Sequence, residues 1–269
     1  MAESVVLKLE DMLPEATYFL NKGVFTEKEM RTIMMERRVY EQALVSHAYS
    51  LRDYFNYINH EIKVECDRRE RYEAMNIKKL DTRDFVIVQR VHHLFNRCIS
   101  KFSEDVSVWH KYIEFCSSSG SSNALSKVLM KAIRRHPRVA SFRVIAADRE
   151  LQQGSLVAAR KMLMRAIRIK TDNHLLVWEQ LFKLECAAIH KQVTVPLKED
   201  KEGDKEPTDI PSVSCRAAAV VYRHAMKELN SNLKFKSFAV EALESLEMSI
   251  MGFKEPEDFD ALRDSIRGI

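Results

Sequence analysis

Three short segments, Arg97-Cys98-Ile99, Lys131-Ala132-Ile133 and Arg165-Ala166-Ile167, recur along the chain at intervals of 34 residues. Each segment has a basic residue, then a small residue, then isoleucine. A second set of positions keeps nearly the same interval, since Trp109, Arg143 and Trp178 are 34 and 35 residues apart. A period of this length with two helical halves is typical of stacked helical hairpins. The sequence therefore predicts an all-α fold, an α-solenoid of hairpins similar to tetratricopeptide (TPR) repeats.

The first helix of each predicted hairpin repeats a set of positions at offsets 0, 3, 4 and 7, which lie on one helix face. This register predicts buried core residues, and it argues against the aromatic side chains being base-stacking platforms. The positions are Tyr54, Tyr57, Ile58 and Glu61; Trp109, Tyr112, Ile113 and Cys116; Arg143, Ala146, Ala147 and Glu150; and Trp178, Leu181, Phe182 and Glu185. The second helices are expected at residues 85–101, 123–136, 155–170 and 214–229.

The chain is expected to divide into an N-terminal helical cap, residues 1–50, and a repeat region, residues 51–269. The cap is predicted to be a helical pair, with a first helix over residues 4–20 and a second that begins at the capping box of Thr26 and Glu29. The repeat region should contain about four hairpins and a truncated fifth. Residues 191–214 hold three prolines and a run of mixed charge, which predicts a disordered insertion. We expect the apolar C-terminal residues Leu262, Ile266 and Ile269 to need a cover from further chain or another subunit.

The composition favours long helices joined by short turns, because 46% of the 269 residues are hydrophobic, 30% are charged, and only 6 are glycine. The five cysteines form no Cys-x-x-Cys pair, and the N-terminus has no apolar run. These features indicate unpaired thiols in a reducing, intracellular compartment. No stretch approaches about 18 consecutive apolar residues, so we expect no membrane span.

Motifs for catalysis, cofactors or metals are not found in the sequence. It contains no nucleotide-binding glycine pattern and no His-Glu-x-x-His motif. The adjacent His92 and His93 would point about 100° apart on a helix, which is poor geometry for a metal, so we expect one to be packed and the other exposed. Cys116 has no placed base and is expected to be a small buried residue. We therefore predict a protein without enzymatic activity, cofactor or metal.

Residues 127–170 are strongly basic, with 12 Lys or Arg against only Asp148 and Glu150. Such a block indicates contact with phosphates or an acidic partner, and the alternative is an ordinary solvated helix surface. We expect Arg97 and Arg165, which repeat in register, to pair with acids such as Glu61 or Glu185. Six basic residues outside this register are the better candidates for contact with a partner or RNA: Arg134, Arg135, Arg138, Arg160, Lys161 and Arg168.

The pairs Ala159-Arg160 and Arg165-Ala166, followed by Trp178 and Glu185, resemble the half-a-TPR (HAT) repeat. The signature residues that match it are Tyr54, Tyr57, Glu61, Trp109, Tyr112, Arg165, Ala166, Trp178 and Glu185. Two positions depart from the pattern, because Cys116 stands where the repeat has Glu and Arg143 where it has Trp.

Residues 9–15, 23–29 and 52–61 narrow this resemblance to the U-three small-nucleolar-RNA-associated proteins of the HAT type. That family supplies a subunit of the UTP-B subcomplex in the small-subunit processome. The resemblance implies a nucleolar scaffold for pre-18S ribosomal RNA processing, with WD-repeat propeller proteins as partners. Contact with pre-ribosomal or small nucleolar RNA is left open. The alternative is a HAT-repeat protein of splicing or messenger-RNA 3′-end processing.

Overall fold

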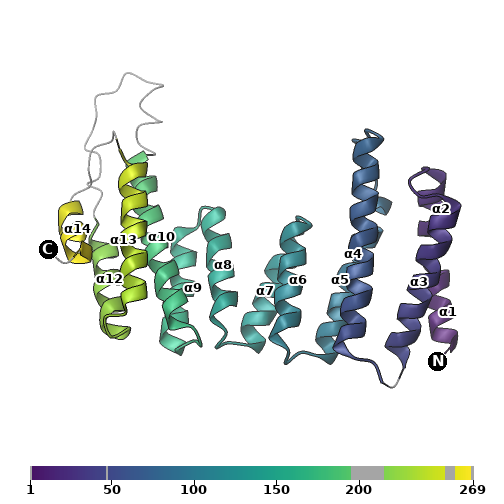
Figure 1. Ribbon diagram of the computed structural model, residues 1–269, viewed down its shortest axis with the longest axis horizontal. Coiled ribbons are helices and arrows are strands. Elements are labelled where there is room, and N and C mark those ends of the chain that lie inside the picture. Colours follow the sequence, from purple (N-terminus) through teal and green to yellow (C-terminus); the bar gives the residue numbers. More distant parts are fainter. Residues whose placement is uncertain (1, 47, 195–214, 252–257, 268–269) are drawn as a thin grey trace. The chain divides into compact units, whose positions relative to one another are not determined.

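The computed structural model describes residues 2–46, 48–194, 215–251 and 258–267 (Figure 1). All regular elements in these residues are helices, which confirms the all-α helical-repeat fold. The chain divides into two compact units, unit 1 over Met1–Val128 and unit 2 over Leu129–Ile269. The division falls within one helix and does not coincide with the one expected at residue 50. Each unit is described separately below.

Unit 1 begins with three helices that pack against the first repeat-like hairpin. Helix α3 contacts α1, α2 and α4, and α5 contacts α4 and α6. The elements are α1 (Ala2–Glu10), α2 (Leu13–Asn21), α3 (Glu27–Val45), α4 (Leu51–Ala74), the 3-10 helix η1 (Thr82–Phe85), α5 (Val86–Lys101), α6 (Val106–Ser118) and the start of α7 (Ser122–Arg135).

The single helix expected over residues 4–20 is wrong, because the chain forms α1 and α2 with a break at residues 11 and 12. Pro14 is the physical reason: it lies in the first turn of α2, where a missing backbone N–H is tolerated. The next expected start is confirmed. Thr26 and Glu29 form the capping box of α3, and the flanking Phe25 and Met30 are both buried.

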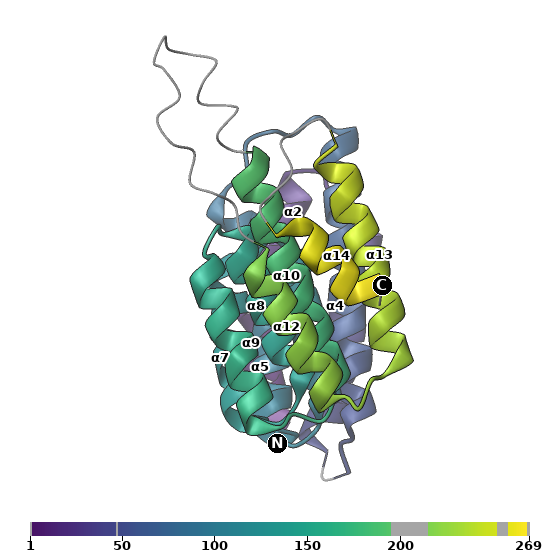
Figure 2. The same ribbon diagram turned by 90° about the vertical axis from the view of Figure 1, so that its left-hand side faces the viewer.

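Unit 2 contains the rest of α7, α8 (Ala140–Gln152), α9 (Leu156–Ile169), α10 (His174–Thr194), α12 (Arg216–Glu228), α13 (Leu233–Ser249) and α14 (Phe259–Arg267). Helix α10 is central and packs against α8, α9, α12 and α13. Figure 2 shows the short α14 (yellow) beside α12 and α13, and it contacts both. One hydrophobic core runs from α8 to α14.

Two expectations about unit 2 change with the structure. Residues 191–194 are the last turn of α10, so the part of the predicted insertion that begins at Lys191 is helical; residues 195–214 lie outside the described residues. The expectation that the C-terminal apolar side chains lack a cover is wrong for Leu262 and Ile266, which are fully buried against α12 and α13. Ile269 lies outside the described residues.

The repeating small residue is fully buried in each second helix. Cys98, Ala132, Ala166 and Ala225 have 0% exposure, and each belongs to a second helix, namely α5, α7, α9 and α12. A small side chain lets this helix approach its neighbours closely, and alanine also favours the helical backbone. The period of the sequence therefore marks a small residue at a fully enclosed position.

Enlarging this position should destabilise unit 2. Replacement Ala166→Leu forces extra methyl groups into a filled contact, and we expect the free energy of unfolding to fall by about 1–3 kcal/mol. Because Trp109 belongs to unit 1 and Trp178 to unit 2, the fluorescence of Trp178 in a Trp109→Phe background reports unit 2 during urea unfolding. The control Val157→Leu, at an exposed position of the same helix, should change the midpoint little. Equal unfolding midpoints for the two variants would contradict the tight contact.

The carboxylate of Asp84 ties α2, α4 and η1 together. It is fully buried and accepts hydrogen bonds from the Tyr18 hydroxyl (2.9 Å), Lys22 Nζ (3.0 Å), the Asp81 N–H (2.6 Å) and the Tyr72 hydroxyl. Burial alone would raise the pKa of this carboxyl. The hydrogen bonds outweigh burial and lower its pKa to about 2.

Stability of unit 1 should therefore depend on acid pH through Asp84. Because the folded-state pKa lies below the unfolded value of 3.8, the contribution is present above about pH 4 and is lost as the pH falls toward 2. The shift corresponds to about 2 kcal/mol at neutral pH. We expect the difference in unfolding free energy between the parent chain and Asp84→Asn to shrink by about that amount from pH 6 to pH 2, measured by Trp109 fluorescence in a Trp178→Phe background. The matched control is Asp11→Asn, at an exposed position. A difference in unfolding free energy between the parent chain and Asp84→Asn that stays constant with pH would contradict the role given to the Asp84 carboxylate.

Candidate nucleic-acid interface

The aromatic signature residues lie in the core, as their register predicts. Tyr54 and Trp109 are each 3% exposed, and Trp178 is 5% exposed. Side chains this deeply buried have no face free for a nucleic-acid base. The signature positions therefore build the hairpins, and a contact surface has to be found among other residues.

Arg143 replaces the signature tryptophan without loss of its hydrogen bond. Trp109 Nε1 donates to the carbonyl of Ser103 at 3.0 Å, and Arg143 Nε donates to the carbonyl of Pro137 at 3.4 Å, in both cases six residues earlier. Burial lowers the pKa of Arg143, and the nearby Arg165 guanidinium lowers it further. Arg143 is thus a structural residue of α8 although it lies in the basic segment.

The acid Glu61 is paired, but its partners differ from those expected. Arg37, which is 1% exposed, donates to Glu61 at 2.7 Å and to Glu15 at 3.0 Å. Arg90 also contacts both carboxylates. Burial would raise the pKa of Glu15, but Arg37 and Arg90 hold it below its usual range. These four groups form a buried ionic cluster between α2, α3, α4 and α5.

The predicted partner of Arg97 was wrong. Arg97 donates to Glu41 near the end of α3 at 2.8 Å, and Lys8 donates to the same carboxylate at 2.7 Å. Arg97 lies seven residues beyond Arg90 on α5, which is about 10 Å along a helix. That distance puts it opposite the end of α3 and not opposite Glu61.

Glu185 is also paired, again with another arginine than expected. Arg160, a candidate for partner contact, donates to Glu185 at 2.6 and 2.7 Å. Arg165, the expected partner, is exposed and lies near Arg143 of α8. The two arginines are five residues apart, which turns them to opposite sides of α9. Arg160 therefore links α9 to α10, and Arg165 is left on the surface.

The other predicted contact residues are all exposed. Arg134 and Arg135 occupy the last turn of α7, and Arg138 lies in the turn before α8. Lys161 and Arg168 lie on α9. Their positions are opposite the buried stripe of Ala159, Leu163 and Ala166, so they point away from the core.

One hydrogen-bonded contact brings the ends of α7 and α9 together. The Asp172 N–H, in the turn after α9, donates to the carbonyl of Arg138 at 2.9 Å. The Asp172 carboxylate in turn accepts the Ala140 N–H at 2.8 Å and so caps α8. The turn that holds Arg138 and the turn that follows Arg168 are thus neighbours, and Asp172 is engaged with backbone groups.

Two residues of this surface were missed as contact candidates. Lys131 and Arg165 are exposed on the same outward faces as Arg134 and Arg168. The signal was present in the sequence, since Lys131 and Arg165 are 34 residues apart, as are Arg134 and Arg168. The prediction that Arg165 pairs with an acid rested on its register beside Ala166, and Lys131 occupies the equivalent position beside Ala132.

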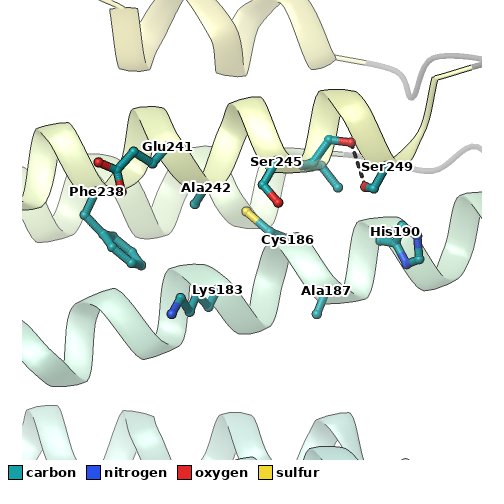
Figure 3. Close-up of a pocket in the computed structure, with 10 residues that line it drawn as sticks. Lys183, Cys186, Ala187, His190, Phe238, Glu241, Ala242, Ser245 and Ser249 are labelled. Carbon is teal, nitrogen blue, oxygen red and sulfur yellow. Dashed lines mark hydrogen bonds between the residues drawn. The ribbon is translucent and has the colours of Figure 1, made fainter.

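A separate groove lies between α10 and α13, with a volume of about 510 Å³. Figure 3 shows Cys186 and His190 on the α10 side, and Phe238 and Ser245 on the α13 side. The Lys183 ammonium lies 5.3 Å from the centre of the Phe238 ring, in cation–π range. Burial raises the pKa of Cys186 to about 12, so its thiol is protonated at neutral pH and serves packing, not nucleophilic attack.

The histidine pair and Cys116, the possible metal ligands and nucleophile of the sequence, lie where the sequence predicts. His92 is half-buried between Tyr112 and Ser121, at 3.2 Å from each hydroxyl, and His93 is exposed. Cys116 is buried at the hairpin contact. Both expectations are confirmed. Over the part of the chain that the structure describes, no three His, Cys, Asp or Glu side chains lie close enough to hold a metal, and no helix has the length and apolar character to span a membrane.

Comparison with known proteins relates the chain to one family. Residues 9–91 match the family described as U3 small nucleolar RNA-associated protein 6. The protein of that name from Schizosaccharomyces pombe is 33% identical over 193 residues, which cover 71% of this chain and 39% of the relative. The Homo sapiens homolog is 28% identical over 212 residues, covering 78% of this chain and 35% of the relative. The Mus musculus homolog is 25% identical over 238 residues, which cover 85% of this chain and 39% of the relative.

The chain spans between 35% and 39% of the length of these curated relatives. The family match over residues 9–91 takes in the whole buried ionic cluster, from Glu15 to Arg90. The chain belongs to the family of U3 small nucleolar RNA-associated protein 6.

Proposed function

We propose that this chain is a scaffold of the small-subunit processome without enzymatic activity, acting in pre-18S ribosomal RNA processing and small-subunit biogenesis. Its partners in this proposal are the WD-repeat propeller proteins of the UTP-B subcomplex, and its compartment is the nucleolus. The observation that carries the proposal is the relation to U3 small nucleolar RNA-associated protein 6 over 193 residues.

The helical hairpins support a scaffold role. Each hairpin packs mainly on its neighbours, so the array offers extended surfaces and not one enclosed active site. The groove between α10 and α13 is lined by apolar and small side chains and has polar groups on its walls, Lys183 and Glu241 among them. Such a groove suits docking of a protein segment better than chemistry on a small substrate.

The alternative, a HAT-repeat protein of splicing or messenger-RNA 3′-end processing, is not favoured. A helical-repeat fold would serve either role, so the fold cannot separate them. The three relatives described above all carry the U3 name. The two functions differ in the RNA that accompanies the protein, and this difference can be measured.

The test is precipitation of the tagged full chain from cell extract. We expect U3 small nucleolar RNA to be enriched at least about tenfold over spliceosomal RNA by quantitative reverse transcription. Mass spectrometry should recover propeller subunits of the processome. The tag alone is the control. Enrichment of spliceosomal or 3′-end-processing particles, or of neither kind of particle, would refute the proposal.

A further inference from the structure

The outward faces of α7 and α9 carry the same basic pattern. Lys131 and Arg134 on α7 correspond to Arg165 and Arg168 on α9, 34 residues later. All four side chains are exposed. Residues four and seven apart on a helix share a face, so Lys161, Arg165 and Arg168 form a row about 10 Å long on α9.

The two helices contribute no acidic residue to these faces. Neither α7 (Ser122–Arg135) nor α9 (Leu156–Ile169) contains Asp or Glu. Within the described residues, Lys131, Arg134, Arg138, Lys161, Arg165 and Arg168 form no ion pair. By contrast Arg160, on the side of α9 that faces α10, is paired with Glu185. The cations that serve the fold are thus separate from those that point to solvent.

A backbone hydrogen bond links the turns that follow the two rows. The hydrogen bond from the Asp172 N–H to the Arg138 carbonyl holds the turns together. Arg134 lies just before the turn between α7 and α8, and Arg138 lies within that turn. Arg168 lies just before the turn that follows α9. We define the basic face as Lys131, Arg134, Arg138, Lys161, Arg165 and Arg168.

We propose that the basic face of unit 2 binds RNA through its sugar–phosphate backbone. The inference rests on the proposed function, since it names a partner within an RNA-containing particle. Several uncompensated cations along a helical ridge are the electrostatic footprint of a phosphate-binding surface. Binding would neutralise phosphates and release their counterions.

The side chains of the basic face favour RNA over an acidic peptide. Protein interfaces depend on buried aromatic or apolar anchors in a well-packed centre. Neither α7 nor α9 contains an aromatic residue, and the apolar side chains exposed among the cations include the flexible Met130 and Met164. The same lack of aromatic residues leaves no platform for base stacking. Recognition should therefore depend on phosphates and show little preference for base sequence.

The experiment measures RNA binding by the purified full chain as a function of salt. The probe is a labelled single-stranded RNA of mixed sequence, followed by fluorescence anisotropy. For the triple variant Arg134→Gln, Arg165→Gln, Arg168→Gln we expect the slope of log affinity against log salt to become shallower by about 2, and the affinity at about 100 mM salt to fall about tenfold or more. The variant should melt at the parent temperature, because all three residues are exposed.

The matched control removes the same charge from the opposite layer of unit 2. Lys191→Gln, Lys234→Gln, Lys236→Gln changes three lysines on α10 and α13, two of them exposed and one half-buried, and it should alter affinity less than about threefold, since solvent-exposed charges are strongly screened over distances of about 10 Å. Equal losses in the two triple variants would overturn the proposal. So would displacement of the RNA by an oligoglutamate peptide at equal charge concentration, which would assign the face to an acidic protein.

The two proposals can fail independently. If U3 RNA co-precipitates with the parent chain while the Arg134, Arg165, Arg168 variant binds free RNA like the parent, the basic face is refuted and the scaffold role stands. If the variant loses RNA binding but the parent chain does not recover U3 RNA from extract, the phosphate-binding face stands and the processome assignment fails.

Discussion

The structure depends on one steric constraint, a small and fully buried residue at the same position of each second helix. At Cys98, Ala132, Ala166 and Ala225 the second helix meets its neighbours with no exposed surface. A larger side chain at these positions would separate the helices and remove the contacts of their larger neighbours, such as Leu163. The bulky residues of the first helices, among them Trp109 and Trp178, fill the remaining volume. A small side chain at each of these positions allows the close packing that protein interiors require.

Charge is arranged around this packing in two ways. In unit 1 the buried Arg37 bridges Glu15 and Glu61, and Arg90 completes the cluster. Removing charges from water is expensive, so such a cluster persists only because each carboxylate meets more than one guanidinium. On α9 in unit 2, Arg160 forms an ion pair with the buried Glu185. The basic residues Lys161, Arg165 and Arg168 of the same helix are exposed to solvent. The same helix therefore serves the fold with one side and offers a uniform positive charge on the other.

The helical period of the sequence correctly predicted the positions of the repeat helices and their buried faces. It did not predict the ion pairs, which depend on the distances between side chains of different helices. The period placed α5, α7, α9 and α12 to within about two residues, and it identified the buried faces from Tyr54 to Trp178. The Thr26 capping box is a local motif and was predicted equally well.

Ion-pair partners were mispredicted because the angle around each helix decides them. Arg160 and Arg165 look equivalent in the pattern, yet only Arg160 turns toward Glu185. The buried role of Arg37 could not be read from an amphipathic stripe, because its partners come from α2 and α4. Most of the candidate contact residues were recognised by charge density. Arg165 is not among them because its place in the repeat register predicts an ion pair, and Lys131 is not among them either.

The hydrogen bonds of Asp172 have a practical consequence for dissecting the chain. Its carboxylate completes the N-terminus of α8, and its N–H fastens the turn that contains Arg138, although it belongs to the following hairpin. Hairpin boundaries read from the helices alone would allow a truncation after Lys170. Such a fragment would leave the first turn of α8 with an unsatisfied backbone donor. The shortest recombinant piece that retains an intact α8 must therefore extend past Asp172 into α10.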